Sequence, residues 1–167
     1  ETERAVEAAR ARLADAFGAR PDEIVYTSGG TESNNMALFG ALKSARGKRR
    51  VIVSAAEHPS VYEAARSLEG APDTEVVFLG CRADGTADLD ALDAALTADA
   101  AFVSIMHVNN EVGAVNDLAA VAALLKKRAP ASVFHSDGVQ AFCKLPFARP
   151  ESALYSVSAH KFHAPKG

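Results

Sequence analysis

Apolar residues along the chain recur at helical spacing in some stretches and as short continuous runs in others. The helical spacing predicts helices over residues 3–17, 31–42, 62–68, 88–96 and 117–128. The short runs predict strands over residues 23–27, 50–54, 75–79, 101–106, 132–135 and 154–158. Gly18 suits the end of the first helix, and Asp88 and Asp117 suit the starts of two later ones.

Strands separated by helices predict a three-layer α/β/α fold, in which a mostly parallel sheet carries helices on both faces. In such sheets, ligands bind beyond the carboxyl ends of the strands. Residues that directly follow a predicted strand are therefore the candidates for a functional site. No internal repeat or long linker divides the chain, so residues 1–167 are expected to form one domain.

Composition and charge narrow the class of protein. Hydrophobic residues make up 49%, charged residues 23%, and the net charge is −3, which gives no support for binding nucleic acid or an anionic membrane. No apolar run approaches the roughly 20 residues that span a bilayer. Cys81 and Cys143 lie far apart and outside any CxxC pattern, so we expect a reducing cytoplasm and no disulfide framework. None of the motifs predicts a metal site.

The first candidate motif is Thr27-Ser28-Gly29-Gly30-Thr31, which follows a predicted strand and opens a helix. Its glycines let the backbone approach a ligand closely, and the free N–H groups of a helix N-terminus attract phosphate. The motif is neither GxGxxG nor a Walker A sequence, which disfavours a dinucleotide or a nucleoside triphosphate. An ordinary glycine turn with a threonine cap explains the motif equally well.

Two further loops follow predicted strands. His58 could stack on a ring or move a proton, although a surface histidine packed against Pro59 is the commoner arrangement. Asn109-Asn110 offers amide donors to a ring substituent, but asparagine also suits an ordinary turn.

Asp137 places a carboxylate at the carboxyl edge of the sheet, where it could keep a pyridine nitrogen protonated or simply cap a helix. Gln140 lies one helical turn further on and could donate to a phenolate oxygen. Asp137 and Gln140 together therefore suit the edge of an aromatic nitrogen heterocycle.

Lys161 follows the last predicted strand and could form a Schiff base, with partial burial freeing its amine. Ser158 and His160 beside it could reach a phosphate. A surface lysine in a polar loop is the alternative, and Lys166 is the competing lysine, although its place between Pro165 and Gly167 suits a turn. Because the chain begins within a helical pattern and stops directly after this motif, we expect it to be a fragment of a longer protein.

Five polar clusters thus follow predicted strands at the same edge of the sheet. They supply phosphate donors, a ring stacker, a carboxylate for a ring nitrogen, a phenolate donor and an amine. Together these groups match one cofactor, pyridoxal 5'-phosphate (PLP).

The motifs TSGGTESNN, EHPSV, MHVNNEVGAVNDL, HSDGVQAFCKLP and SVSAHKFHAPKG, in this order, resemble those of the cysteine desulfurases. The resemblance is to their NifS/IscS-like branch, within the class V aminotransferase family of PLP-dependent transferases. It implies an aspartate-aminotransferase-like, fold-type I large domain over residues 1–167, with Lys161 and His58 as catalytic residues. It also implies that PLP is bound by Gly30, Thr31, His58, Asn110, Asp137, Gln140, Ser158, His160 and Lys161.

The resemblance further implies a reaction. L-cysteine becomes L-alanine, and its sulfur passes as an enzyme persulfide to an acceptor or scaffold protein for iron–sulfur cluster or thiocofactor biosynthesis. A cytoplasmic homodimer is implied as well. Selenocysteine lyase, another class V PLP enzyme and a non-catalytic scaffold with the same fold remain as alternatives.

Two departures from the family pattern bear on activity. Neither Cys81 nor Cys143 matches the position of the family's nucleophilic cysteine. The catalytic cysteine loop, the small C-terminal domain and the N-terminal segment of the family are also absent from this sequence. The isolated chain is therefore expected to be incomplete for turnover.

Overall fold

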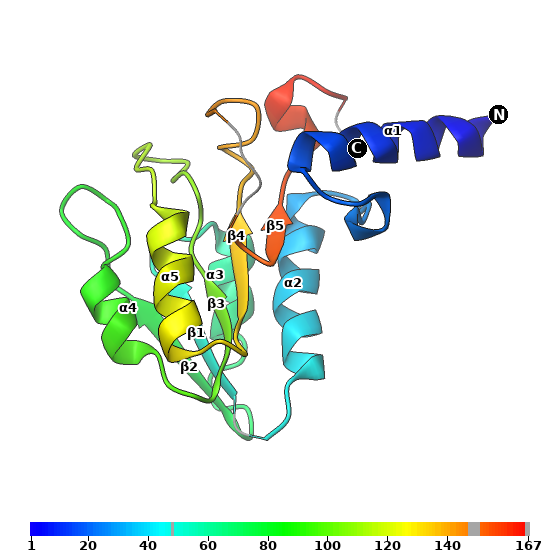
Figure 1. Cartoon of the computed structure of the whole chain (residues 1–167). Coiled ribbons are helices and arrows are strands. Elements are labelled where there is room, and N and C mark those ends of the chain that lie inside the picture. The colour runs from blue at the N-terminus through cyan, green and yellow to red at the C-terminus, as the bar shows by residue number, and fades with distance from the viewer. Residues whose placement is uncertain (48, 147–150, 166–167) are drawn as a thin grey trace.

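The computed structural model describes residues 1–47, 49–146 and 151–165. Its helices and strands are, in chain order, α1 (Thr2–Phe17), α2 (Gly30–Ser44), β1 (Arg49–Ser54), α3 (Pro59–Arg66), β2 (Thr74–Leu79), α4 (Leu89–Ala95), β3 (Ala100–Ser104), α5 (Leu118–Arg128), β4 (Val133–Asp137) and β5 (Leu154–Ser156). Two short 3₁₀ turns, η1 (Pro21–Glu23) and η2 (Ala159–Phe162), complete the described elements. The strands form one parallel sheet in the order β2-β1-β3-β4-β5 (Figure 1).

Both faces of the sheet are covered by helices, as the sequence predicts. Val51 and Val53 of β1 belong to an apolar cluster with α2 and α3. Ile52, which lies between them in the sequence, belongs instead to a cluster with α4 and α5. Successive side chains of a strand point to opposite faces, so the continuous apolar run of β1 supplies both layers of the core. The predicted three-layer α/β/α fold is confirmed.

The sheet has a topological switch point between β1 and β3. The chain adds β2 on one side of β1 and then crosses back to add β3, β4 and β5 on the other side. At such a point the two connections leave in opposite directions and open a crevice outside the carboxyl ends of the strands. Residues 55–58 after β1 and residues 105–113 after β3 therefore lie where a ligand is expected.

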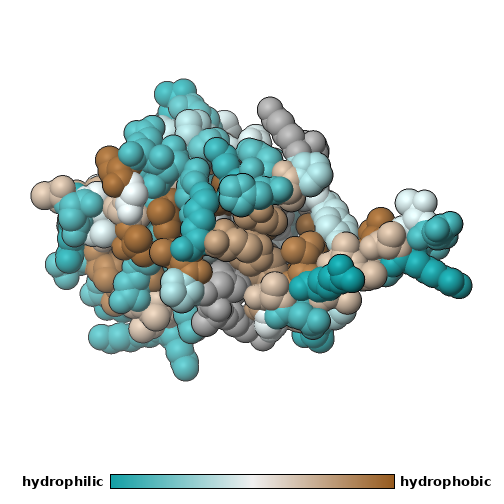
Figure 2. All heavy atoms as spheres, turned by 90° about the horizontal axis from the view of Figure 1, so that it is seen from above, coloured by the Kyte–Doolittle hydropathy of each residue, from teal (hydrophilic) through white to brown (hydrophobic). Residues whose placement is uncertain are grey.

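α1 is anchored at its C-terminal end, while the rest of the helix projects from the body of the molecule (Figures 1 and 2). Phe17 stacks on Phe142 at a centroid distance of 4.5 Å and meets the edge of Tyr155 at 6.2 Å. Gly18 then ends the helix in the left-handed conformation, with φ 61°, as the sequence predicts. No helix in the described ranges is long and apolar enough to cross a membrane.

One predicted strand, residues 23–27, is wrong. Glu23 ends η1, and residues 24–27 have no regular secondary structure. Ile24 is extended, with φ −92° and ψ 121°, as its β-branched side chain favours. A strand also needs a neighbour to share its hydrogen bonds, and within the described residues none pairs with this segment. The other predicted helices and strands are present, with ends that differ by at most three residues.

Candidate active site

A pocket of about 290 Å³ lies at the carboxyl ends of the strands. It collects residues from the start of α2 and from the segments that follow β1, β3, β4 and β5. Its lining includes all nine residues that the sequence predicts for a cofactor site, which are Gly30, Thr31, His58, Asn110, Asp137, Gln140, Ser158, His160 and Lys161. The expected convergence is therefore present, while the role of each residue stays a prediction.

Asp137 is the buried carboxylate of this pocket, with 3% of its surface exposed. Its Oδ2 accepts a hydrogen bond from Asn34 Nδ2 at 2.8 Å. Its Oδ1 accepts one from the backbone N–H of Val139 at 2.9 Å. Both carboxylate oxygens thus have a donor, which a buried charge requires. These bonds fix the carboxylate at the end of β4.

His58 is tied to Asp137 through two intermediate side chains. The Asn34 amide that bonds Asp137 also donates to Ser60 Oγ at 2.9 Å. Ser60 Oγ lies 2.8 Å from Nδ1 of His58, and the Ser60 backbone N–H donates to the same Nδ1 at 3.1 Å. Because Nδ1 accepts this bond, a neutral ring carries its proton on Nε2. The His58 side chain also caps the N-terminus of α3.

The opposite part of the pocket has the character of an anion site. α2 begins at Gly30, and no side chain caps its N-terminus. A Cβ on Gly30 would lie 3.3 Å from Val139 Cγ2 and 3.7 Å from Ser158 Cβ. The absence of a side chain at Gly30 therefore leaves space between the start of α2 and these two residues. The buried Ser158 hydroxyl lies 3.0 Å from Nδ1 of His160. A helix N-terminus, a hydroxyl and an imidazole together suit a phosphate.

The chain matches a known protein family along its whole length. The model of the aminotransferase class-V family matches residues 1–167. The chain belongs to this family. Among curated relatives it is 42% identical to cysteine desulfurase IscS of Photorhabdus laumondii and of Escherichia coli, and 41% identical to that of Proteus mirabilis. Each alignment covers 100% of this chain and 41% of the relative, so the chain spans about two fifths of these proteins.

Solved structures of the family share the fold. A NifS-like protein superposes with a TM-score of 0.90 at 35% identity, over 96% of this chain and 45% of that protein. SspA in complex with cysteine gives 0.89 at 34% identity, over 98% and 47%. DndA from Streptomyces lividans gives 0.84 at 37% identity, over 99% and 46%. The predicted fold-type I large domain is confirmed by these neighbours.

Class V aminotransferases and the IscS and NifS cysteine desulfurases are PLP-dependent, and the pocket fits that group. Asp137 suits the pyridine nitrogen, and the anion site suits the phosphate. Gln140 Oε1 accepts a hydrogen bond from Lys144 Nζ at 2.6 Å, which leaves the Gln140 amide protons for a phenolate oxygen. Asn34 lines the pocket with a buried Oδ1 that has no hydrogen-bond partner among the described residues. Such an atom suits a pocket that receives a polar ligand.

Lys161 differs from its prediction in one respect. The sequence suggested partial burial, but the side chain lies exposed in η2 at the rim of the pocket. Its backbone N–H donates to the Ser158 carbonyl at 2.9 Å, which holds the turn against the end of β5. The predicted partial burial of Lys161 is therefore not present in this structure. The competing Lys166 lies outside the described residues.

The two asparagines after β3 have separate roles. Asn109 is buried, donates from Nδ2 to the Ala56 carbonyl at 2.9 Å, and accepts through Oδ1 from the N–H groups of Glu111 and Val112. It therefore shapes its own loop and ties that loop to the one after β1. Asn110 is exposed and lines the pocket. Its contact with the cofactor or the substrate carboxylate stays a prediction.

Sequence reasoning assigned no role to four residues that also line the pocket: Asn34, Ser60, Met106 and Val139. For Asn34 a signal was available, because it lies four residues after Gly30 and therefore on the same face of α2. Ser60 offered only a hydroxyl two residues after His58. Met106 and Val139 are apolar, and no pattern distinguishes them from core residues.

His135 in β4 is fully buried and links β4 to both neighbouring strands. Its Nδ1 lies 2.9 Å from Ser104 Oγ, and its Nε2 lies 2.9 Å from Ser156 Oγ. Burial lowers the pKa of His135 to about 3, so the ring is neutral at physiological pH. No group of three or more His, Cys, Asp or Glu side chains in the described part of the chain is arranged to hold a metal ion.

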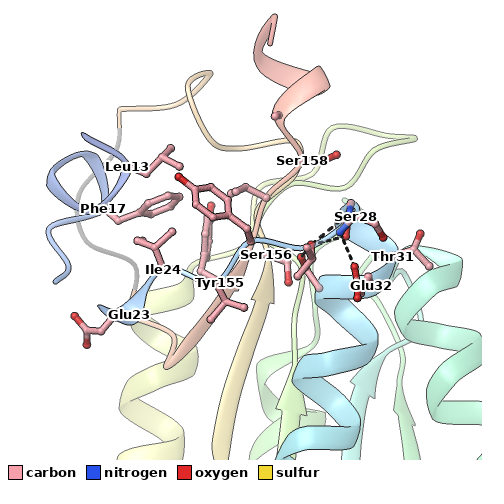
Figure 3. A pocket seen from close by; sticks show the side chains of 18 of the residues that line it. Leu13, Phe17, Glu23, Ile24, Ser28, Thr31, Glu32, Tyr155, Ser156 and Ser158 are labelled. Atoms are coloured by element: carbon pink, nitrogen blue, oxygen red, sulfur yellow. Dashed lines mark hydrogen bonds between the residues drawn. The ribbon is translucent and has the colours of Figure 1, made fainter. Parts of the chain in front are cut away.

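A larger hollow of about 550 Å³ adjoins the pocket (Figure 3). The residues common to both are Gly30, Thr31, Ser158 and His160. Its other side is apolar and includes Phe17, Ile24 and Tyr155 (Figure 3). Asp137 and Lys161 line only the smaller pocket, so the predicted cofactor chemistry belongs there.

Proposed function

We propose that this chain forms the PLP site of a cysteine desulfurase that converts L-cysteine to L-alanine. The observation that carries the proposal is the convergence of Lys161, His58 and Asp137 with an anion site in one pocket. The relatives named cysteine desulfurase, and the neighbour solved in complex with cysteine, support L-cysteine as the substrate. Because the chain spans about two fifths of these relatives, the proposal concerns the whole protein.

The side chains of the pocket have distinct proposed tasks. PLP, when bound, supplies an electron sink for negative charge that develops at the substrate Cα. Asp137 would hold a proton at the pyridine nitrogen, and Lys161 would anchor the cofactor covalently and take the Cα proton on Nζ. His58 would lie against the ring, with its Nε2 proton available for transfer. The phosphate would bind at Gly30, Thr31, Ser158 and His160, and Gln140 and Asn110 would donate to the ring oxygen or the substrate carboxylate.

Sulfur transfer needs a thiolate that can reach the substrate sulfur. Cys81 and Cys143 are exposed, and neither lines the pocket. We therefore assign the persulfide to a cysteine elsewhere in the whole protein, from which sulfur passes to an acceptor or iron–sulfur scaffold protein. Free, exposed thiols suit a reducing compartment such as the cytoplasm. A homodimer is the quaternary state that the family resemblance favours.

The test of this proposal is the response of the PLP-loaded protein to L-cysteine. L-cysteine should change the absorption spectrum of the bound cofactor and, in the whole protein, yield L-alanine. L-serine, which has the same shape without sulfur, should yield no L-alanine. A preference for L-selenocysteine would favour a selenocysteine lyase instead, and failure to bind PLP at all would favour a non-catalytic scaffold.

A further inference from the structure

Glu57 is a buried carboxylic acid at the switch point of the sheet, with 7% of its surface exposed. It directly precedes His58, and its Oε1 accepts a hydrogen bond from the backbone N–H of Met106. His58 and Met106 both line the pocket. One carboxyl group therefore joins the loop after β1 to the segment after β3, across the crevice where the ligand is expected.

A negative charge is not needed for this connection. The bond from Asn109 Nδ2 to the Ala56 carbonyl joins the same two loops with a neutral amide. Glu57 Oε2, by contrast, is buried and has no hydrogen-bond partner among the described residues. A buried carboxylate oxygen without a donor is costly, whereas a protonated carboxyl carries no charge to satisfy.

The groups around Glu57 also disfavour its ionised form. Asp137 at the end of β4 is the charged group that acts on it, and the two would repel if both were ionised. The Ser104 hydroxyl of β3 and the Met106 N–H, which follows β3, favour the ionised form and partly offset this repulsion. His135 contacts the same Ser104 but is neutral. Burial, followed by the charge of Asp137, raises the pKa of Glu57 to about 8.

We propose that Glu57 is a positioning residue that keeps a proton on its buried carboxyl group. In this form it fixes the loop that carries His58 to the segment after β3 without adding a second negative charge beside Asp137. The single carboxylate of Asp137 then faces the ligand. The positioning role rests on the proposed PLP site, whereas the protonation of Glu57 does not.

Infrared spectroscopy of the protein without cofactor tests the protonation directly. With ¹³C-labelled glutamate, the wild type at pH 7 should show the C=O stretch of a protonated carboxyl group, shifted by the label. Glu57→Gln should remove this band, and Glu111→Gln, at an exposed glutamate, should keep it. Absence of the band from the wild type at pH 7 would overturn the proposal, whether or not the protein binds PLP.

PLP titration then tests the positioning role. Glu57→Gln keeps a neutral acceptor for the Met106 N–H, so its affinity for PLP at pH 7 should stay within about threefold of the wild type. Glu57→Ala leaves that N–H without an acceptor, so its affinity for PLP should fall by about tenfold or more. Above pH 8 the wild-type affinity should fall as Glu57 ionises, and that of Glu57→Gln should not fall at this step. Equal losses in the two variants, or the same fall at high pH in Glu57→Gln, would contradict the role. A wild type that binds no PLP would refute the proposed function and leave the infrared result to decide the protonation.

Discussion

Asn34 Nδ2 donates a hydrogen bond of 2.8 Å to Asp137 Oδ2 and so joins α2 to the end of β4 across 103 positions of sequence. The same amide group donates to Ser60, which in turn contacts His58. The proposed partner of the ring nitrogen and the proposed ring stacker therefore belong to one hydrogen-bond network. In a hydrogen-bond network of this kind, the loss of one member affects the others.

Replacement of Asn34 should destabilise the protein. Asn34→Leu would leave Asp137 Oδ2 buried without this donor, so the free energy of unfolding should fall by about 1–3 kcal/mol. Urea denaturation measures this change. Asn110→Leu, at the exposed asparagine of the same pocket, should stay within about 0.5 kcal/mol of the wild type. Equal stability of Asn34→Leu and the wild type would show that the Asn34–Asp137 bond contributes little.

His135 should make the fold sensitive to acid. Its pKa is lowered from 6.5 to about 3 in the folded state, so the unfolded chain takes up a proton first as the pH falls. The contribution of His135 to the free energy of unfolding should therefore decrease below pH 6.5, by at most about 1.4 kcal/mol per pH unit for this one proton. In urea titrations between pH 4.5 and 6.5, the free energy of unfolding of His135→Asn should rise relative to that of the wild type as the pH falls, because the variant lacks this contribution. The exposed His163→Asn is the matched control and should keep the wild-type slope.

Glu57 should lower the free energy of unfolding as the pH rises, which is opposite to the effect of His135. Its folded pKa of about 8 lies above the ordinary value of 4.5, so the unfolded chain releases the proton first. The resulting stability is fully present below pH 4.5 and is lost as the pH rises to about 8. Between pH 7 and 8, where His135 contributes little, the free energy of unfolding of the wild type should fall. The fall in the free energy of unfolding with rising pH should be smaller in Glu57→Gln but unchanged in Glu111→Gln.

Gly138 should not tolerate a side chain. A Cβ at this position would lie 1.9 Å from Cζ of Tyr155, whose hydroxyl is held 2.8 Å from Nδ1 of His107. Gly138→Ala should therefore lower the free energy of unfolding by about 1–3 kcal/mol or more through overpacking. Gly40→Ala is the control, because a Cβ there would meet no atom within 4 Å and alanine favours a helix interior. A small effect at Gly138 would mean that the Tyr155 ring moves aside easily.

The position of the site could be predicted from the sequence because it depends only on where strands end. Asp137 and Lys161 each follow an apolar run, and parallel strands bring their carboxyl ends to one edge. This reasoning needs no contact between particular side chains. The residues that follow β1, β3, β4 and β5 could therefore be placed around one pocket, whereas Gly30 and Thr31 follow residues 23–27, which are not a strand.

Other features depended on contacts that no local pattern encodes. Residues 24–27 have the composition of a strand, but pairing is set by neighbours distant in the sequence. The bond between Asn34 and Asp137 links elements that are 103 positions apart. The exposure of Lys161 follows from how η2 lies at the rim of the pocket. In each case tertiary packing decided the outcome and local propensity did not.

We propose that Lys161 holds PLP in a pocket built around Asp137 and His58. The most direct test is the absorption spectrum of the protein after addition of PLP, recorded for the wild type and for Lys161→Ala. We expect a band at roughly 400–430 nm, characteristic of a lysine-bound cofactor, in the wild type alone. Identical spectra for the two proteins, both those of free PLP, would contradict it.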